Sequence, residues 1–295
     1  METRKPAVIA LGMFDGVHIG HQELLGTAAS LADALDAACC VYTFENHPAE
    51  LLGRHVELLT GAEERRALLS MFGADEVYME RFDETIMNLS PEAFVRRLCG
   101  AWHVRGVVAG FNYTFGDRGA GTSDTLRALG KELGFSVMIV PKVSVDGEPV
   151  SSSRIRSLLQ TGDVRMAARL LGRAYAVSGM VCPNRQNGRK IGFPTANLLP
   201  EPGRALPRHG VYVTEAITDA GTFRGVTNIG ANPTVHGDRV TIETHLLGFT
   251  GELYGKHLEV RFLERIRGEH TFASLSELKT QIREDANAAA RYGKE

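Results

Sequence analysis

An apolar run of strand length followed at once by a glycine-rich loop constrains the fold of this chain more than any other feature. Residues 7–11 read Ala-Val-Ile-Ala-Leu, a pattern typical of a strand buried on both faces of a parallel sheet. Behind the loop, apolar residues recur at helical spacing at Leu24, Ala28, Leu31 and Leu35. The loop at residues 12–21 therefore follows the carboxyl end of a strand, where open α/β sheets bind their ligands.

The loop itself carries residue types suited to a bound phosphate. Gly12, Gly16 and Gly20 allow the backbone to approach a bulky anion. His18 and His21 are three residues apart at the start of the helix, so they face the same way. Free amides and the helix dipole would add to the imidazole donors, which suits a nucleoside triphosphate. The alternative is a glycine-rich turn with two surface histidines.

Length and composition limit the classes of protein. A chain of 295 residues predicts two compact units, and a formal net charge of −2 gives no basic excess for nucleic acid. The four cysteines form no CxxC pair, which indicates small buried side chains in a reducing compartment. No leader-like segment or apolar run of membrane-spanning length is found in the sequence. We therefore expect a soluble cytoplasmic protein without membrane or nucleic acid partners.

Strand and helix patterns alternate through the first half, which predicts a doubly wound α/β parallel sheet. The expected further strands span residues 37–44, 76–82, 106–111 and 136–143. The expected further helices begin at a capping box over Thr60–Glu63 and at Ser90-Pro91, and a third runs through Leu126, Leu129 and Leu133 to Gly134.

Two more segments of this half have the composition of a site. Residues 112–121 combine Asn112, an aspartate, an arginine and three glycines, which suits a polar substrate held against backbone. The alternative is an ordinary glycine-rich loop. Residues 151–156 place three serines and two arginines at a helix start, a possible phosphate clamp. There the alternative is a serine N-cap with solvated arginines.

The sequence pattern changes from alternating strands and helices to short strands after two short helical segments that end at Gly172. The expected domain boundary therefore lies between residues 172 and 173. Short strands and turns follow, and one long helix is predicted to start at a capping box over Ser274–Glu277. A small antiparallel barrel with a C-terminal helix is the expected second domain.

Two stretches of the second half carry possible chemistry. Thr195 and Asn197, in the segment Gly192–Asn197, offer neutral oxygen ligands suited to magnesium, although a turn entering a strand has the same pattern. Glu243 lies on an alternating stretch at residues 240–249, where it can act as a general base for a substrate hydroxyl. The alternative is the polar face of a half-exposed strand.

Taken together, these stretches resemble the bacterial bifunctional riboflavin kinase/FAD synthetase family over essentially the whole chain. Gly12–His21 is similar to its nucleotidyltransferase signature GxFDGxHxGH, and Gly192–Asn197 to its flavokinase segment GFPTAN. The other similar stretches are Phe111–Gly121, Ser152–Arg156, Asn228–Thr234 and Glu243–Leu246, in the family's order.

The resemblance implies two consecutive reactions. ATP phosphorylates the ribityl 5′-hydroxyl of riboflavin in the C-terminal domain, and the FMN phosphate then attacks the α-phosphate of a second ATP in the N-terminal domain to give FAD. Magnesium is the implied cofactor and ATP the co-substrate. Riboflavin, FMN and ATP are the implied small-molecule partners, with flavoenzymes as acceptors of FAD.

The resemblance also implies roles for particular residues. Catalysis falls to His18, His21, Asn197 and Glu243, and metal binding to Thr195 and Asn197. ATP and phosphate binding falls to Gly12, Phe14, Asp15, Gly16, Gly20, Ser152, Ser153, Arg154, Arg156, Gly192 and Pro194. Flavin binding falls to Asn112, Phe115, Gly116 and Phe193.

The chain departs from the family pattern mainly in its second half. Residues 184–189 keep only part of a GDGRGR-like phosphate loop, and Gly248 stands where the family commonly has an acidic residue. In the first half, Asn46 replaces a proline and Ser153 replaces a threonine. These departures leave open an FAD synthetase with weakened or lost kinase activity. A flavin-binding regulator and a cytidylyltransferase-like enzyme for another phosphorylated alcohol are further alternatives.

Overall fold

The computed structural model describes residues 6–183, 192–234 and 237–293, and the side chains of residues 232–239 are not described. The altered phosphate loop at residues 184–189 lies outside the described residues. The chain divides into two compact units, Met1–Ser152 and Ser153–Glu295. No helix within the described ranges is both long and apolar enough to cross a lipid bilayer.

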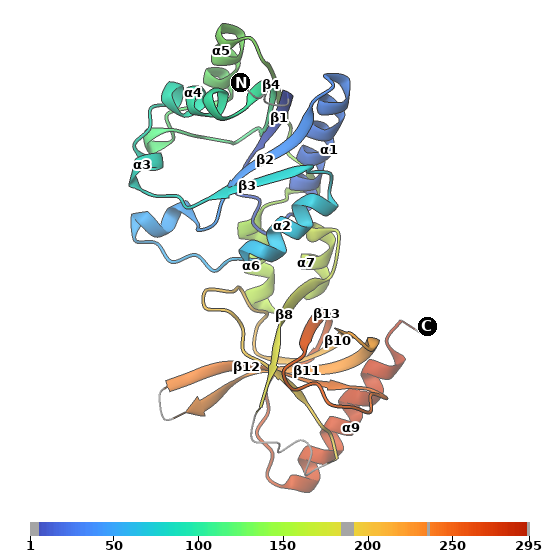
Figure 1. Ribbon diagram of the computed structural model, residues 1–295. Helices are drawn as coiled ribbons and strands as arrows, with labels where there is room; N and C mark the ends of the chain where they lie inside the picture. Colours follow the sequence, from blue (N-terminus) through green and yellow to red (C-terminus); the bar gives the residue numbers. More distant parts are fainter. Residues whose placement is uncertain (1–5, 184–191, 235–236, 294–295) are drawn as a thin grey trace. The chain divides into compact units, whose positions relative to one another are not determined.

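The first unit alternates strands and helices as expected (Figure 1). Its strands are β1 (Pro6–Leu11), β2 (Ala38–Phe44), β3 (Glu76–Glu80), β4 (His103–Gly110), β5 (Ser136–Val140), β6 (Ser144–Val145) and β7 (Glu148–Pro149). Its helices are α1 (Ile19–Ala34), α2 (Ala62–Met71), α3 (Glu84–Met87), α4 (Pro91–Ala101) and α5 (Ser123–Leu133), with short 3₁₀ turns at Pro48–Leu52 and Asp117–Gly119.

Five strands form a parallel sheet in the order β3-β2-β1-β4-β5, which confirms the doubly wound fold. Side chains of β1 alternate between two cores. Val8 and Ala10 pack with α1 and α2 on one face, whereas Ile9 and Leu11 pack with α4 and α5 on the other. Because helices cover both faces, the residues of β1 had to be apolar on both sides.

The predicted capping box at Thr60–Glu63 is wrong in its detail. Helix α2 begins at Ala62, its N-cap is Gly61, and no side chain caps it. The Thr60 hydroxyl instead accepts a hydrogen bond from the backbone N–H of Gly16, at 3.1 Å. The Thr60 hydroxyl therefore bonds a residue distant in the sequence instead of the helix N-terminus that the capping-box pattern predicted.

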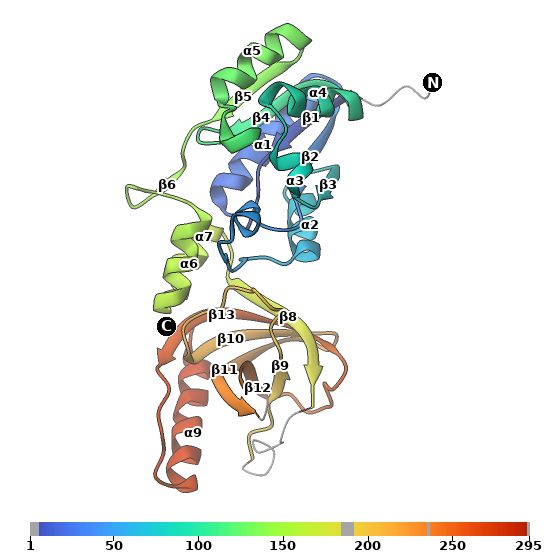
Figure 2. The same cartoon turned by 90° about the vertical axis from the view of Figure 1, so that its left-hand side faces the viewer.

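The second unit is a closed barrel in the order β10-β11-β12-β9-β8-β13, with every adjacent pair antiparallel (Figure 2). Its strands are β8 (Tyr175–Cys182), β9 (Ala196–Leu198), β10 (Gly210–Thr218), β11 (Gly221–Thr234), β12 (Gly237–Leu246) and β13 (His257–Arg267). Helices α6 (Ser152–Thr161) and α7 (Val164–Leu171) precede it, and α9 (Leu275–Arg291) follows. The expected barrel with a C-terminal helix is confirmed.

Helix α9 covers the outer surface of the barrel. Its Ala289 packs with Val211 and Val213 of β10 and Val226 of β11. Its N-cap is Ser274, whose hydroxyl accepts from the N–H of Glu277, while the Glu277 carboxylate accepts from the N–H of Ala273. The capping box predicted for this helix is therefore confirmed.

All four cysteines are free thiols. Cys39 and Cys40 of β2 are buried, as expected, and burial raises the pKa of Cys39 to about 11 and that of Cys40 to about 12. Cys99 on α4 and Cys182 on β8 are only half-buried, so the expectation of buried thiols is wrong for these two. Burial is also the main cause that raises the pKa of Cys99.

One ion pair fastens α9 to the barrel. The Arg267 guanidinium donates from Nη2 to Oδ2 of Asp285 at 2.7 Å and from Nε to Oδ1 at 3.1 Å. The Asp285 side chain is 3% exposed and that of Arg267 is 23% exposed. The pair is bidentate and largely shielded from water, so removal of one partner leaves the other partly desolvated.

We expect Asp285→Ala to lower the free energy of unfolding of the barrel by about 2 kcal/mol, less than the ~3–5 kcal/mol of a fully buried pair because Arg267 retains some water. Urea-dependent hydrogen exchange of barrel peptides measures this. Glu284→Ala, an exposed acidic residue of the same helix, is the matched control and should change it by less than about 0.5 kcal/mol. Equal effects of the two changes would contradict the conclusion that the Arg267–Asp285 ion pair stabilises the barrel.

Candidate functional site

The loop after β1 is fixed by the carboxylate of Asp15, which is 1% exposed. The backbone N–H of Leu59 donates to both of its oxygens, at 2.9 and 3.1 Å, and the N–H of Thr60 donates to Oδ1 at 3.1 Å. The next residue, Gly16, donates its N–H to the Thr60 hydroxyl. Asp15 therefore joins the loop to the segment before α2, and its predicted part in ATP binding stays a prediction.

The loop backbone is strained. Phe14 has φ 52°, Gly16 has φ 81° and Val17 has φ 40°. A positive φ is unfavourable for a β-branched residue, and such strain costs about 1–3 kcal/mol per residue where the surroundings impose it. Backbone strain of this kind is concentrated at ligand-binding sites, which agrees with the position of the loop at the carboxyl edge of the sheet.

The two histidines of the loop stack on each other. Their ring centroids are 3.6 Å apart with an interplanar angle of 13°. His18 is the N-cap of α1, and its Nδ1 accepts a hydrogen bond from the N–H of His21 at 3.2 Å. A neutral His18 ring therefore carries its proton on Nε2, where it can donate to a ligand.

Glycine at position 20 leaves room for the close approach of the His18 ring. A Cβ at position 20 would lie 3.2 Å from Cε1 and 3.3 Å from Nδ1 of the His18 ring. Gly12 has a similar role, since a Cβ there would lie 3.1 Å from the Phe14 ring. The Phe14 ring also packs edge to face with His21, with centroids 5.2 Å apart, so three predicted phosphate-binding residues, Gly12, Phe14 and Gly20, adjoin the two histidines.

His21 is held neutral by its surroundings. Burial of the ring, then the nearby His18 and then Arg65 lower its pKa well below the ordinary value of 6.5. One side of the residue reaches the surface, but Nδ1 is inaccessible and has no hydrogen-bond partner among the described residues. An unpartnered buried nitrogen is costly in a structural role and is expected at a binding site.

The serine segment contributes one observed contact to this loop. The Ser152 hydroxyl donates to the backbone carbonyl of Asp15 at 2.8 Å. Ser153, Arg154 and Arg156 follow on α6, in the second compact unit, so their predicted contacts with phosphates stay predictions.

The loop after β4 lies at the same edge of the sheet, because β4 pairs in parallel with β1 up to Leu11 and Ala109. Asn112 is exposed there. Phe115 is buried against Phe94, with ring centroids 5.6 Å apart. Gly116 has φ 73°, and a Cβ on it would lie 2.7 Å from the backbone nitrogen of Pro91, so only glycine fits. Their predicted contacts with flavin stay predictions.

In the barrel, strand register brings Glu243 beside Asn197. Glu243 of β12 lies directly opposite Asn197 of β9 and, on the other side, opposite Asn228 of β11. Residues directly opposite each other share one face of a sheet. Glu243 is half-buried, while its neighbours Ile242 and Thr244 point into the barrel and are buried. The structure thus brings together a carboxylate and two amides that are distant in sequence.

The segment that leads into β9 is fixed by His245. Its Nδ1 is 2.8 Å from the carbonyl oxygen of Pro194, and its ring packs edge to face with Phe193 at 5.5 Å. The Asn197 amide donates to the carbonyl of Thr195 at 3.4 Å. His245 lies one side-chain repeat along β12 from Glu243, so one strand orients both parts of this site.

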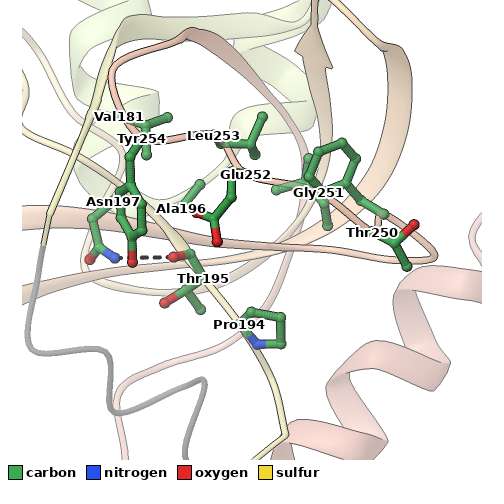
Figure 3. Close-up of a pocket in the computed structure, with 12 residues that line it drawn as sticks. Val181, Pro194, Thr195, Ala196, Asn197, Thr250, Gly251, Glu252, Leu253 and Tyr254 are labelled. Carbon is green, nitrogen blue, oxygen red and sulfur yellow. Dashed lines mark hydrogen bonds between the residues drawn. The ribbon is translucent and has the colours of Figure 1, made fainter.

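A pocket opens over this segment (Figure 3). It is lined by Val181, Pro194, Thr195, Ala196, Asn197, Leu246, Phe249, Thr250, Gly251, Glu252, Leu253 and Tyr254. Figure 3 shows the side chains of Glu252 and Tyr254 pointing toward the Thr195–Asn197 segment. Residues 250–254 were not predicted from the sequence, where the turn-like Leu253-Tyr254-Gly255 was the available signal.

The donor set at this pocket limits the kind of metal it can hold. The described residues contain no group of three or more His, Cys, Asp or Glu side chains able to bind a metal ion. The oxygens of Thr195 and Asn197 are hard neutral ligands, which suit a magnesium ion that keeps water and phosphate in its remaining positions. A zinc or iron site does not fit these residues.

Comparison with known proteins matches each unit to a family. Residues 1–154 match the FAD synthetase family and residues 171–293 match the riboflavin kinase family. The chain is 37% identical over 298 residues to a bifunctional riboflavin kinase/FMN adenylyltransferase of Bacillus subtilis, covering 99% of this chain and 94% of that protein. It is 35% identical over 289 residues to a protein of the same description from Escherichia coli, covering 97% and 92%.

A solved structure is similar over nearly the whole chain. The crystal structure of a protein described as a macrolide-efflux protein, from Streptococcus pneumoniae, has a TM-score of 0.91 and 31% sequence identity. It covers 99% of this chain and 96% of that chain.

Because the pKa of His21 is lowered on folding, we expect stability to depend on pH. The unfolded chain binds a proton near pH 6.5 and the folded chain does so only at lower pH, so stability falls as pH decreases below about 6.5. Thermal unfolding of the first unit between pH 8 and 5 measures this. His21→Gln should flatten the acid side of the profile, whereas His103→Gln, at an exposed histidine, should not.

Proposed function

The chain belongs to the bifunctional riboflavin kinase/FMN adenylyltransferase family, and from this premise we propose that it converts riboflavin to FMN and FMN to FAD. Each step consumes one ATP. The observation that carries the proposal is that one chain holds both the stacked His18 and His21 at a sheet edge and the Asn197–Glu243 pair in a barrel.

In the adenylyl transfer, a phosphate oxygen of FMN forms a bond to the α-phosphorus of ATP and the bond to pyrophosphate breaks. No protein nucleophile is needed, so positioning and electrostatics supply the rate. His18, with its donor on Nε2, and the neutral His21 stabilise charge on the α- and leaving phosphates. Free backbone amides at the start of α1 add to them. Asn112 places the substrates, and Ser152, Ser153, Arg154 and Arg156 contact phosphates.

In the kinase step, the ribityl 5′-hydroxyl of riboflavin attacks the γ-phosphorus of ATP and ADP leaves. Glu243 accepts the hydroxyl proton, which is the role of a general base. Its place between Asn197 and Asn228 supports this role, since amide groups can orient a carboxylate without neutralising it. Phe193 contacts the flavin, and Gly192 and Pro194 approach the nucleotide.

Thr195 and Asn197 would hold Mg²⁺, which when bound neutralises phosphate charge. The functional boundary lies between residues 172 and 173, so that α6 and α7 belong with adenylyl transfer. We also infer a cytoplasmic location from the free thiols, and flavoenzymes as acceptors of the FAD product.

A second candidate function keeps only adenylyl transfer. It is favoured by residues 184–189, which retain only part of the family's phosphate loop and lie outside the described residues. Robust formation of FMN from riboflavin would exclude it.

We expect the purified protein to form FMN and then FAD from riboflavin, ATP and Mg²⁺, measured by chromatography. His21→Ala should lower FAD formation at least ~100-fold and spare FMN formation, because a preorganised group at the developing charge is lost. Glu243→Gln should lower FMN formation by ~100-fold or more and spare FAD formation from supplied FMN.

Two variants control for general damage. His103→Ala removes an exposed histidine of the same unit, and Glu259→Gln changes a half-buried strand glutamate that lies on β13. Neither should lower either activity more than about twofold. Loss of both products in folded His21→Ala or Glu243→Gln protein would refute the division into two sites.

Metal removal provides a separate prediction. EDTA should abolish formation of both products, and Mg²⁺ should restore it. Thr195→Val, which removes the hydroxyl at nearly constant volume, should raise the Mg²⁺ concentration needed for half-maximal FMN formation about tenfold or more, with the requirement for FAD formation unchanged. An unchanged requirement for FMN formation would contradict the assignment of Thr195 as a ligand.

A further inference from the structure

Arg65 is the largest of the fully buried side chains, with 0% of its surface exposed. It lies on the first turn of α2, and its N–H donates to the carbonyl of Gly61 at 2.9 Å. Arginine is rarely fully buried unless its charge is paired. Among the described residues its guanidinium forms no ion pair, although Asp15 and Glu45 are near enough to favour its charged form.

Only one of the three guanidinium nitrogens of Arg65 has hydrogen-bond partners among the described residues. Nη2 donates to the carbonyl oxygens of Phe44 at 2.6 Å and Glu45 at 3.1 Å. Nε and Nη1 are inaccessible and have no hydrogen-bond partner among the described residues. Each unmade hydrogen bond of a buried donor is unfavourable. A methionine would fill much of the same volume without that penalty, so packing alone does not account for an arginine here.

The position of Arg65 links it to the nucleotide loop. Phe44 and Glu45 end β2, which pairs in parallel with β1 up to Tyr42 and Leu11. The segment just before α2, Leu59 and Thr60, is the one to which Asp15 is bonded. The guanidinium therefore lies at the carboxyl edge of β1 and β2, beneath the loop that carries His18 and His21.

The charge of Arg65 acts on His21. Among the described residues, His18 on the same loop and Arg65 on α2 both disfavour a proton on the His21 ring. Asp15 and Glu45 face Arg65 instead and favour its cation. A guanidinium stays protonated in proteins even when burial lowers its pKa. Arg65 thus supplies a permanent positive charge next to a histidine that remains neutral.

We propose that Arg65 is a positioning residue for adenylyl transfer, which supplies fixed positive charge behind His18 and His21 for the triphosphate. It acts through His21 and the loop and does not touch the substrate, since its side chain is fully covered. The role in catalysis rests on the proposed function, whereas the effect on His21 can be measured without any reaction.

The first test is NMR titration of the histidine rings in the ligand-free, full-length protein. The His21 signal is assigned by its loss in His21→Gln. Arg65→Gln should raise the pKa of His21 toward 6.5, because one nearby charge is removed, and Arg65→Lys should leave it low. Arg66→Gln is the matched control, because that neighbour also bonds a backbone carbonyl, that of Val77 at 2.6 Å, but on β3. It should not shift His21.

The second test is kinetic. Arg65→Gln should lower kcat/KM for ATP in FAD formation about tenfold or more and move the acid limb of its pH profile upward. FMN formation from riboflavin should be unchanged, which shows that the barrel is intact, and native dispersion of the histidine NMR signals shows that the first unit is folded. Arg65→Lys should recover most of the loss, and Arg66→Gln should match the unmodified protein.

Three results would overturn the proposal. The first is an unshifted His21 titration in Arg65→Gln. The second is a fall in FAD formation equal to that of Arg66→Gln. The third is failure of both Arg65→Gln and the apolar Arg65→Met to fold, which would make Arg65 a structural residue. If the unmodified protein makes no FAD, the proposed function fails, and the His21 titration still decides whether Arg65 controls that ring.

Discussion

The carboxylate of Asp15 is the contact on which the first site depends. It accepts hydrogen bonds from the backbone of Leu59 and Thr60, and so ties the loop after β1 to the segment before α2. Only such an external constraint can hold Phe14 and Val17 at positive φ. The loop in turn presents His18 as the cap of α1, with His21 stacked on it. A buried carboxylate thus sets the geometry of the loop that carries two imidazoles.

The second candidate site depends on strand register instead of a hydrogen-bonded loop. Glu243 and Asn197 are brought together by strand register in a closed barrel, where a slip of one residue would turn Glu243 toward the interior. The interior is already filled by Ile242 and Thr244, so the register is strongly specified. The hydroxyl of Thr244 bonds that of Thr227 at 2.9 Å, which adds a buried polar contact that only this register permits. A strained loop positions His18 and His21, whereas strand register positions Glu243 and Asn197.

Periodicity predicted the fold class of both units because it reports which faces are buried. It could not predict strand order, nor which loops meet, because those depend on contacts between segments far apart in the chain. Thr60 illustrates the limit. Its hydroxyl does not cap the following helix but accepts a hydrogen bond from Gly16, a residue 44 positions away. The pairing of Glu243 with Asn197 was likewise outside the reach of spacing, although each residue was identified separately.

Arg65 was overlooked for another reason. It stands in the run Glu63-Glu64-Arg65-Arg66, which resembles a solvated helix face. Its spacing to Leu68, Leu69 and Phe72 nevertheless places it on the apolar face of α2, so the signal was present. A charged residue at an apolar helical position is therefore worth separate attention, because it is either paired or functional.

The placement of the thiols makes the native chain convenient to label. The three cysteines of the first unit have raised pKa values, so little thiolate forms on them at neutral pH. Cys182 lies directly opposite Asn197 in the sheet, on the face that carries Glu243. A thiol-reactive fluorophore is accordingly directed to a position beside Asn197 and Glu243, where its emission can report a ligand bound to the barrel without an introduced cysteine.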